Sequence, residues 1–387
     1  MTDDVLEFIN SHKCVFVNGP AGSGKSYLIK EIVKSNEGLN IAITSSTGIS
    51  STSIGGITVH SFLGMGVDTD VEQIVASFKF KQKLVDLRIL DILIIDEISM
   101  ISSNLFDTIH NILCYTKRST LPFGGIRVIC LGDFFQLPPV KGDYAFKSKY
   151  WSLLKPVNMN KIYRQTDQKY INLLNKVRIG EIDEDVISIL NSKLIDKTHK
   201  LDDKLYLFPR NKEVDAINTI KFKEISNLNE IKTYHMDLHN TTNFTLIPNI
   251  LKLCKRCKVI LLINLDQERG LINGSVGIVK GFMGDLPIVE FENGITETIQ
   301  KFIWTSKDKT KRISQIPLKL AYALSIHKSQ GMTLENAVID LKDCFIHGQL
   351  YVALSRIKNL DGLYIINFDK KSIIVDEDVK KYYKTIT

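Results

Sequence analysis

Eight consecutive residues near the start of the chain have the types and spacing needed to bind a nucleoside triphosphate. They are Gly19, Pro20, Ala21, Gly22, Ser23, Gly24, Lys25 and Ser26, and they fit the pattern G-x-x-x-x-G-K-[ST]. The glycines let backbone N–H groups turn toward phosphates, Lys25 can reach the outer phosphates, and the Ser26 hydroxyl can hold Mg²⁺. Residues 14–17 predict a strand before this loop and residues 26–34 a helix after it, which is the context that the pattern requires.

Two carboxylates follow a hydrophobic run about seventy residues further along the chain. Asp96 and Glu97 come directly after the apolar residues 93–95, which predict the end of a buried strand. Asp96 is placed to hold Mg²⁺ together with Ser26, and Glu97 is placed to take a proton from an attacking water. Asp-Glu pairs are common on surfaces, but one that follows a phosphate loop at a strand end indicates catalysis.

A further predicted strand, residues 127–131, leads to Gln136, which precedes two prolines. The Gln136 side chain can hydrogen-bond the attacking water or the γ-phosphate; the alternative is a turn residue before the prolines. Ligands collect at the carboxyl ends of strands in parallel sheets, which favours the first interpretation.

Two arginines in the later part of the chain are candidates to neutralise the charge that spreads over a transferred phosphoryl group. Arg164 follows a tyrosine, and Arg356 lies at the end of a largely apolar helical segment, residues 348–357. A single arginine more often forms a surface ion pair, and the apolar surroundings of Arg356 make that alternative less favourable there.

Two stretches, residues 44–64 and 325–331, combine hydroxyls, small residues and a few rings. Hydroxyl and amide groups suit the phosphates of a single nucleic-acid strand, and rings suit its bases. Loops that cap helices have the same composition, so the residues alone leave both interpretations open.

The composition sets broad limits on what the protein is. With 387 residues, 24% charged and 44% hydrophobic, the chain has room for about two soluble domains. Its net charge of +7 weakly favours a polyanionic partner. No apolar run is long enough to span a bilayer, and the acidic first residues do not resemble a secretory or import leader. We therefore expect a soluble intracellular protein without a membrane partner.

The six cysteines are scattered, as in proteins that keep their thiols reduced. Cys254 and Cys257 form a C-x-x-C pair shortly after His235 and His239, a set of ligand types that can hold zinc. However, no second C-x-x-C pair exists and residues 259–265 predict a buried strand. Ordinary thiols and surface histidines are the favoured interpretation.

Short apolar runs alternate with helical segments through most of the chain, which predicts parallel sheets covered by helices. Strands are predicted at residues 14–17, 39–44, 89–95, 127–131, 205–208, 259–264, 318–325, 337–339 and 363–368, and helices at 104–116, 211–225 and 348–357. Residues 270–312 differ, because strands at 275–281, 286–291 and 295–300 are joined by turn signals and predict a small antiparallel module.

These segments together resemble the superfamily-one helicases, and most closely their PIF (petite integration frequency) group, in the branch that also contains RecD. The resemblance covers nearly the whole chain through the phosphate loop and residues 46–48 with 58–64, 94–100, 122–125, 132–140, 163–165, 265–279, 321–334 and 350–356. It implies an α/β fold of two RecA-like P-loop domains in tandem, residues 1–150 and 151–387. It also implies an SH3-like β insert at residues 270–312. Separately, the polar and helical composition of residues 65–83 predicts a small inserted subdomain or wedge there.

The resemblance further implies an ATP- and Mg²⁺-dependent 5′-to-3′ DNA helicase that moves along single-stranded DNA and unwinds 5′-tailed duplexes as a monomeric motor. Replication, repair, recombination and telomere maintenance are the processes that such a motor serves. Carried over by position, catalysis is assigned to Lys25, Asp96, Glu97, Gln136, Arg164 and Arg356, and Mg²⁺ to Ser26 and Asp96. ATP is expected on residues 19–26 and on Gln330, Gly331 and Glu335. DNA is expected on Thr47, His60, Ser61, Phe62, His327 and Ser329.

One departure from the family pattern concerns the nucleobase. Members usually carry a glutamine just before the first strand that reads adenine, and no glutamine precedes residue 14 here. Use of other nucleoside triphosphates is therefore expected. Two alternatives remain at this point: a nucleotide-gated binding switch that does not translocate, and a motor of the same fold that runs on RNA.

Overall fold

The computed structural model describes residues 2–46, 51, 54–65, 71–196, 204–227, 229–239, 247–263, 265–266, 268–271, 274–305 and 312–386. The chain divides into two compact units, Met1–Lys200 with Ser329–Thr387, and Leu201–Lys328. These units divide the chain differently from the expected boundary at residue 150, which stays a prediction.

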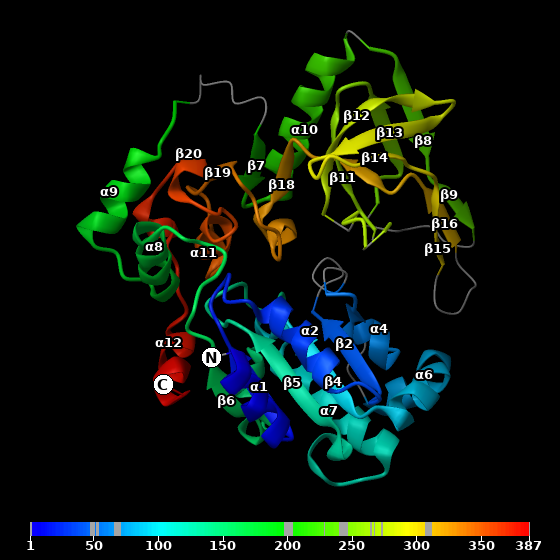
Figure 1. The fold of residues 1–387 in the computed structure, drawn as a ribbon, viewed down its shortest axis with the longest axis vertical. Coiled ribbons are helices and arrows are strands. Elements are labelled where there is room, and N and C mark those ends of the chain that lie inside the picture. The colour runs from blue at the N-terminus through cyan, green and yellow to red at the C-terminus, as the bar shows by residue number, and fades with distance from the viewer. Residues whose placement is uncertain are drawn as a thin grey trace. The chain divides into compact units, whose positions relative to one another are not determined.

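A six-stranded sheet forms the centre of the larger unit (Figure 1), in the order β3-β2-β4-β5-β1-β6. Every pairing in it is parallel. Because the strands are parallel, the carboxyl ends of the central strands lie at one edge, where the sequence places its polar groups. The strands are β1 (Cys14–Asn18), β2 (Ile41–Ser45), β3 (Ile57–Thr58), β4 (Ile92–Asp96), β5 (Arg127–Gly132) and β6 (Lys155–Asn158).

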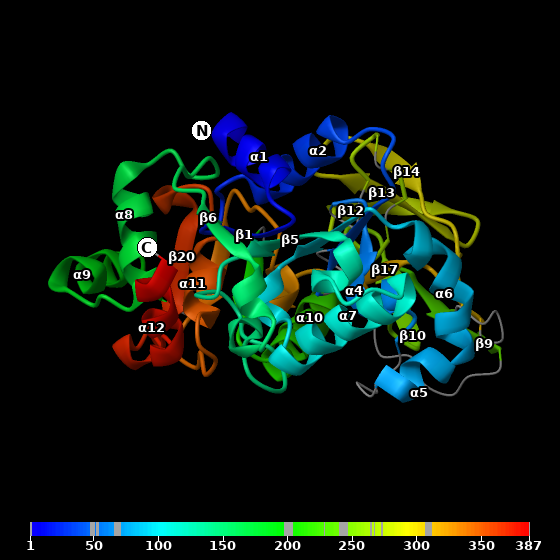
Figure 2. The ribbon, with the colours of Figure 1, turned by 90° about the horizontal axis from the view of Figure 1, so that it is seen from below.

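Helices cover both faces of this sheet. Along β1, Val15 and Val17 pack in the cluster that contains α1 (Thr2–Ser11) and α2 (Lys25–Ser35). Phe16 packs in the opposite cluster with α7 (Ser103–Lys117), because successive strand residues face opposite sides. Figure 2 shows the sheet between α1 and α2 on one side and α7 on the other. The predicted strands at 14–17 and 127–131 and the helix at 104–116 are confirmed.

The prediction of a strand over residues 89–95 began too early, because Ile89 still belongs to helix α6 (Phe78–Ile89) and the strand starts at Ile92. Residues 65–83 include α5 (Val71–Ala76) and the first part of α6, and Ile74 of α5 is buried in the core. The remaining elements of this unit are α4 (Val59–Leu63), α5 (Val71–Ala76), α6 (Phe78–Ile89), α8 (Gln168–Ile179), α9 (Glu184–Ser192), β19 (Ala337–Asp340), α11 (Gln349–Leu354), β20 (Leu363–Asn367) and α12 (Glu377–Ile386).

The smaller unit contains a parallel pair of strands with one helix, followed by antiparallel sheets. The pair is β7 (Leu205–Phe208) with β18 (Ala323–Ser325), and the helix is α10 (Asn211–Ser226). A five-stranded sheet has the order β14-β13-β12-β11-β17, a three-stranded sheet the order β15-β16-β9, and β10 pairs with β8. Their bounds are β8 (Ile231–His235), β9 (Asp237–His239), β10 (Ile250–Cys254), β11 (Lys258–Leu261), β12 (Val276–Met283), β13 (Leu286–Phe291), β14 (Thr296–Thr298), β15 (Phe302–Thr305), β16 (Arg312–Gln315) and β17 (Leu318–Leu320).

The antiparallel strands predicted between residues 275 and 300 are present as β12, β13 and β14. The predicted strand over residues 318–325 is divided, because β17 and β18 join different sheets. Within the described ranges, no helix combines the length and the apolar character needed to cross a membrane.

A tight turn, residues 122–125, connects α7 to β5. Phe123 is buried there and packs edge-on against Phe106 at 5.6 Å between ring centroids. Gly124 and Gly125 both have left-handed backbone, with φ of 67° and 87°. A Cβ on Gly124 would lie 2.6 Å from the carbonyl oxygen of Leu113, whereas one on Gly125 would meet nothing closer than 3.6 Å.

We expect Gly124→Ala to destabilise the protein more than Gly125→Ala. The left-handed backbone costs each alanine roughly 1–2 kcal/mol, and the steric clash with helix α7 adds to that cost only at residue 124. Urea unfolding followed by circular dichroism measures the difference. Equal losses of stability in the two variants would contradict the packing described here.

Candidate active site

A cavity of about 510 Å³ opens at the carboxyl edge of the parallel sheet, a volume within the range of small-molecule sites. All of its lining residues belong to the larger unit. They are Ala21, Gly22, Ser23, Gly24, Lys25, Ser26, Asp96, Glu97, Gln136, Tyr163, Arg164, Gly331, Thr333, Arg356 and Lys358. The sequence-predicted catalytic residues Lys25, Asp96, Glu97, Gln136, Arg164 and Arg356 are thus brought together.

The phosphate loop has the geometry that its glycines predict. Gly22 and Gly24 have φ of 81° and 89°, and helix α2 begins at Lys25. The Lys25 ammonium donates hydrogen bonds to the carbonyl oxygens of Gly19 (2.6 Å) and Pro20 (3.0 Å). Burial lowers the pKa of Lys25, while the carboxylates of Glu97, Asp133 and Asp96 act in the opposite direction. This buried cation is therefore held at the point where a phosphate would arrive.

Asp96 and Glu97 are buried side by side at the end of β4. The Asp96 carboxylate accepts a hydrogen bond from the Glu97 backbone N–H at 2.9 Å. Burial and then repulsion from Glu97 raise the pKa of Asp96 to about 7, against the attraction of Lys25. Glu97 has left-handed backbone with φ of 52°, and its Oε2 atom is buried without a hydrogen-bond partner. One carboxylate oxygen is thus left available to a ligand or a water in the cavity.

Arg164 is fixed to the phosphate loop through the backbone. The N–H groups of Tyr163 and Arg164 donate to the carbonyl oxygen of Gly22 at 2.8 and 3.3 Å. A Cβ on Gly22 would lie 2.7 Å from the Arg164 Cβ, so only glycine allows this close approach. The Arg164 guanidinium donates to the Ser355 carbonyl at 2.9 Å, and burial lowers its pKa.

Arg356 is a buried cation, only 2% exposed, that forms no salt bridge with any residue the structure describes. Its guanidinium donates to neutral acceptors, the carbonyl oxygens of Val352 (2.9 Å) and Met332 (3.4 Å) and the Ser355 hydroxyl (2.8 Å). Burial and then repulsion from Arg164 lower the pKa of Arg356 to about 9. The side chain remains charged at neutral pH, and two unneutralised guanidinium groups therefore face the same cavity.

Arg356 follows the end of helix α11, and two side chains hold this helix end in place. These contacts were not predicted from the sequence. The buried Gln165 amide donates to the carbonyls of Ser355 (3.2 Å) and Ile357 (2.8 Å), and the Tyr170 hydroxyl donates to that of Leu354 (2.8 Å). These side chains satisfy carbonyl groups that the end of a helix leaves unpaired. The only local signal for them is the position of Gln165 directly after Arg164.

Tyr351 of α11 also contacts the phosphate loop, because its hydroxyl accepts a hydrogen bond from the Ala21 N–H at 2.9 Å. At the start of the same helix, Gly348 has φ of 70°, and a Cβ there would lie 2.3 Å from the Phe135 carbonyl oxygen. The helix therefore packs directly against the loop that carries Gln136, whose side chain is buried and lines the cavity.

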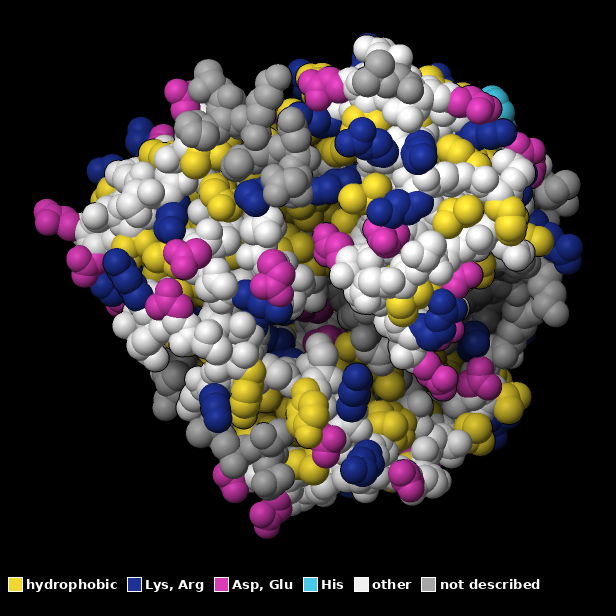
Figure 3. Space-filling model, turned by 45° about the horizontal axis from the view of Figure 1, so that its top comes forward, with side chains coloured by type: hydrophobic (Ala, Val, Ile, Leu, Met, Phe, Trp, Pro, Cys, Tyr) yellow, Lys and Arg dark blue, Asp and Glu magenta, His cyan; other side chains and the backbone are white. Residues whose placement is uncertain are grey.

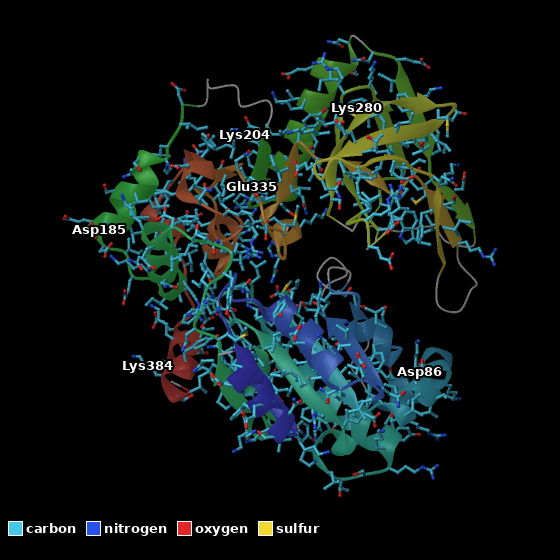
Figure 4. The ribbon with its side chains drawn as sticks, in the orientation of Figure 1. Asp86, Asp185, Lys204, Lys280, Glu335 and Lys384 are labelled. Carbon is cyan, nitrogen blue, oxygen red and sulfur yellow. The ribbon has the colours of Figure 1, made fainter. Side chains whose placement is uncertain are left out.

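Three further cavity residues were not predicted: Tyr163, Thr333 and Lys358. Tyr163 is 51% exposed, with the Lys161 ammonium 4.9 Å from its ring centroid. An exposed ring beside a phosphate loop offers a flat surface to a nucleobase. Lys358 pairs with Glu335, which is labelled in Figure 4 and lies two residues before the first residue of β19.

The residues expected to contact ATP outside the phosphate loop are placed differently from one another. Gly331 lines the cavity, with φ of 82°. Glu335 is exposed and is absent from the lining, and Gln330 is buried with its side-chain Nε2 unpartnered. Of these three, only Gly331 reaches the cavity wall.

The residues expected to contact DNA belong to both units of the chain and differ in their exposure. Thr47 lies outside the described residues. His60 is exposed on helix α4, and Ser61 is half-buried, with its N–H bonded to the Thr58 hydroxyl. Phe62 packs in the core of the larger unit, so its ring has no exposed face on which a base could stack. In η5 (Ile326–Ser329), His327 is half-buried and Ser329 is buried.

The structure brings together no group of three or more potential metal ligands within its described residues. Cys254 pairs with Ile231 across β10 and β8, whereas His235 pairs with Ile250 at the other end of the same ladder. Four residues along a strand separate groups by roughly 13 Å, far beyond a shared zinc coordination shell. Cys254 and Cys257 are buried in an apolar cluster, in agreement with ordinary thiols.

The positive net charge does not form one continuous basic area on the face drawn in Figure 3. Lys and Arg side chains are interspersed there with Asp and Glu.

Comparison with known proteins gives consistent matches over the chain. Family models match residues 2–188 as PIF1-like helicase and residues 237–282 as the 2B domain of DNA helicase Pif1. The chain is 37% identical to ATP-dependent DNA helicase PIF1 of Danio rerio, over 99% of this chain and 63% of that protein. It is 35% identical to ATP-dependent DNA helicase Pif1 of Bdellovibrio bacteriovorus, over 98% and 90%.

A solved structure extends this similarity to three dimensions. The Pif1 helicase from Bacteroides in complex with ADP-AlF3 and single-stranded DNA matches with a TM-score of 0.81 and 31% identity, covering 99% of this chain and 96% of that one. The chain spans under two thirds of the length of the vertebrate relatives, 63% of the Danio rerio protein.

The raised pKa of Asp96 makes the stability of the protein depend on pH. The folded chain binds a proton on the Asp96 carboxyl more tightly than the unfolded chain does. The stabilisation that this protonated carboxyl gives the fold is therefore present below the ordinary pKa near 4 and is lost as the pH rises through about 7. Asp96→Asn carries no charge, so we expect its thermal midpoint to exceed that of the wild type at pH 8 and to converge with it toward pH 4.

Asp91→Asn is the matched control, because hydrogen bonds from Asn40 lower the pKa of Asp91. The pH dependence of stability has the opposite sign for the Asp91 carboxyl. Its stabilisation of the fold is present above its ordinary pKa and is lost as the pH falls below that pKa. Its variant should therefore be less stable than the wild type at pH 8. Differential scanning fluorimetry across pH 4–8 measures both, and an Asp96→Asn variant no more stable than the wild type at pH 8 would refute the assignment.

Proposed function

Because this chain belongs to the PIF1-like helicase family, we propose that it is an ATP-dependent DNA helicase that moves 5′-to-3′ along single-stranded DNA. The observation that carries the proposal is the single cavity in which the phosphate loop, Asp96, Glu97, Arg164 and Arg356 meet. The names and bound molecules of the similar helicases support DNA as the track. Unwinding in replication, repair or recombination is the corresponding cellular role.

The cavity favours a highly charged anion as its ligand. Arg164 and Arg356 contribute two positive charges that only neutral groups contact, and Lys25 contributes a third. Burial outweighs the attraction of the nearby carboxylates at all three cations, and a triphosphate would supply further negative charge. The Ser23 hydroxyl is also buried without a hydrogen-bond partner, as is expected of a group whose partner is a ligand.

Hydrolysis requires a base, a water-orienting group and positive charge on the γ-phosphate. We assign Glu97 as the base because it lines the cavity and one of its carboxylate oxygens is buried without a hydrogen-bond partner, and we assign Gln136 as the group that orients the water. Asp96 and Ser26 are oxygen donors of the kind that Mg²⁺ prefers, and both line the cavity. When bound there, Mg²⁺ would neutralise phosphate charge.

Coupling to movement needs two states of the protein that bind the nucleotide with different strength. Shifting a two-state equilibrium from 1:99 to 99:1 takes about 5.5 kcal/mol of differential affinity. Two charge-assisted contacts of about 1.5–3 kcal/mol each, from Arg164 and Arg356, together supply roughly 3–6 kcal/mol, which reaches this value near the upper end of the range. Cleavage of the γ-phosphate would remove these contacts and allow the strand to be gripped in a new position.

The nucleobase is expected to be bound without strong selection. The exposed Tyr163 ring at the cavity offers stacking, which every base can provide. Hydrolysis of GTP at a rate near that of ATP is the corresponding expectation for this enzyme.

Arg356→Ala tests the assignment of the second arginine. A group that neutralises charge chiefly in the transition state lowers kcat when it is removed, and arginine fingers of this kind contribute roughly a factor of 10³. We expect kcat of DNA-stimulated ATP hydrolysis to fall by about this factor, while affinity for a fluorescent ATP analogue falls less than tenfold. Lys25→Ala should lose both. A variant at residue 356 with wild-type turnover would remove Arg356 from the mechanism.

Duplexes with a single-stranded tail test the track and the direction. We expect unwinding of a 5′-tailed DNA duplex with ATP, and none of a 3′-tailed one, because the strand would be pulled in one sense only. Lys25→Ala provides the control for ATP dependence. Unwinding of the 3′-tailed duplex alone would refute the polarity, stimulation by RNA and not by DNA would indicate an RNA motor, and binding without stimulated turnover would indicate a switch.

A further inference from the structure

A buried polar cluster lies behind the phosphate loop, formed by Asn18, Asp133, Arg178 and Tyr383. None of these residues lines the cavity. They come from β1, the loop after β5, helix α8 and helix α12, so four separate segments meet at one point. We infer that Tyr383 is a positioning residue for ATP hydrolysis, one that aligns the phosphate loop with the loop that carries Gln136.

The Tyr383 hydroxyl is the centre of the cluster. It lies 2.8 Å from the Asn18 side-chain oxygen and 3.2 Å from an oxygen of the Asp133 carboxylate, and accepts a hydrogen bond from the Phe134 N–H at 3.0 Å. Asn18 directly precedes Gly19, the first residue of the phosphate loop. One hydroxyl thus joins the start of the phosphate loop to residues 133 and 134.

Arg178 of helix α8 holds the same Asp133 carboxylate. Its guanidinium donates two hydrogen bonds to Asp133, at 2.9 and 2.8 Å, a bidentate geometry that holds a carboxylate in one orientation. The guanidinium also lies 4.6 Å from the Phe135 ring centroid and 5.3 Å from that of Tyr383. The rings of Phe135 and Tyr383 stack at 4.6 Å. Burial opposes the charge on Arg178, but the Asp133 carboxylate outweighs it and raises the pKa of Arg178.

These contacts determine where Gln136 is held. The Asp133 carboxylate accepts the Phe135 N–H at 3.1 Å, and the Asp133 carbonyl accepts the Gln136 N–H at 2.9 Å. The residue proposed to orient the attacking water is thus three residues from a carboxylate that Tyr383 and Arg178 hold in place. A shift of this loop by a fraction of an ångström would displace the water without removing any group that binds ATP.

The neighbouring tyrosine on the same helix offers a matched control. The Tyr382 hydroxyl accepts a hydrogen bond from the Trp151 indole at 2.9 Å, and its ring stacks on Phe146 at 4.4 Å. It contacts neither the phosphate loop nor Asp133 in the part of the chain that the structure describes. Helix α12, marked in Figure 4 by Lys384, therefore carries two adjacent tyrosines, Tyr382 partly buried and Tyr383 buried, and only the Tyr383 hydroxyl reaches the proposed catalytic loops.

The inference rests on the proposed ATP hydrolysis, and its test compares Tyr383→Phe with Tyr382→Phe in the full chain. Each change removes one hydroxyl and keeps the ring. We expect Tyr383→Phe to lower kcat of DNA-stimulated hydrolysis at least fivefold with KM for ATP within twofold of the wild type. Tyr382→Phe should keep kcat within twofold, with a comparable change in thermal midpoint.

Arg178→Lys provides a second and independent arm, because it keeps the charge but not the bidentate hydrogen bonds to Asp133. It should show the same fall in kcat at unchanged KM. The positioning role would be overturned by equal kcat values for the two tyrosine variants. A higher KM for ATP at unchanged kcat would also overturn it. A wild-type protein that does not hydrolyse ATP would instead refute the proposed function, so the two failures are distinguishable.

Discussion

The structure of the site depends on charges that are buried at the carboxyl edge of a parallel sheet without full neutralisation. Asp96 and Glu97 lie beside one another, and Lys25 and Arg356 lie close enough to act on them electrostatically. Such an arrangement is unfavourable in an empty cavity, since each charge has given up water and gained incomplete compensation. A triphosphate would complete it, so the cost of folding this site is directly linked to the gain on binding.

Backbone contacts, more than charge pairs, keep these groups in place against mutual repulsion. Arg164 is attached to Gly22 by main-chain hydrogen bonds, and Gln165 is attached to the carbonyls on either side of Arg356. The two arginines, which repel each other, are therefore held by neighbouring residues with no charge. A change in either attachment would move an arginine relative to the phosphate loop, which is how binding could be transmitted to the rest of the unit.

Local patterns in the sequence were sufficient for the strands, the phosphate loop and the polar residues at the strand ends. These features depend on short-range rules, namely alternation of apolar residues and the conformational freedom of glycine. The contacts of Gln165, Tyr351 and Tyr383 were not predictable, because each joins residues more than a hundred positions apart and has no local pattern. Phe62 was predicted to contact DNA, but its ring packs in the core. An aromatic residue in a polar segment has the same local sequence pattern in both cases, so the sequence does not distinguish them.

The contacts of Tyr383 connect a helix distant in sequence from the phosphate loop to the proposed catalytic site. Asp133 has no exposed surface, and a buried carboxylate is unfavourable unless hydrogen-bond donors replace the lost water. Arg178 supplies charge and two hydrogen bonds, and the Tyr383 hydroxyl lies within bonding distance of the same carboxylate. The loop that carries Gln136 is therefore stabilised by helices α8 and α12 from behind, and the cavity side of that loop remains free for the nucleotide and the attacking water.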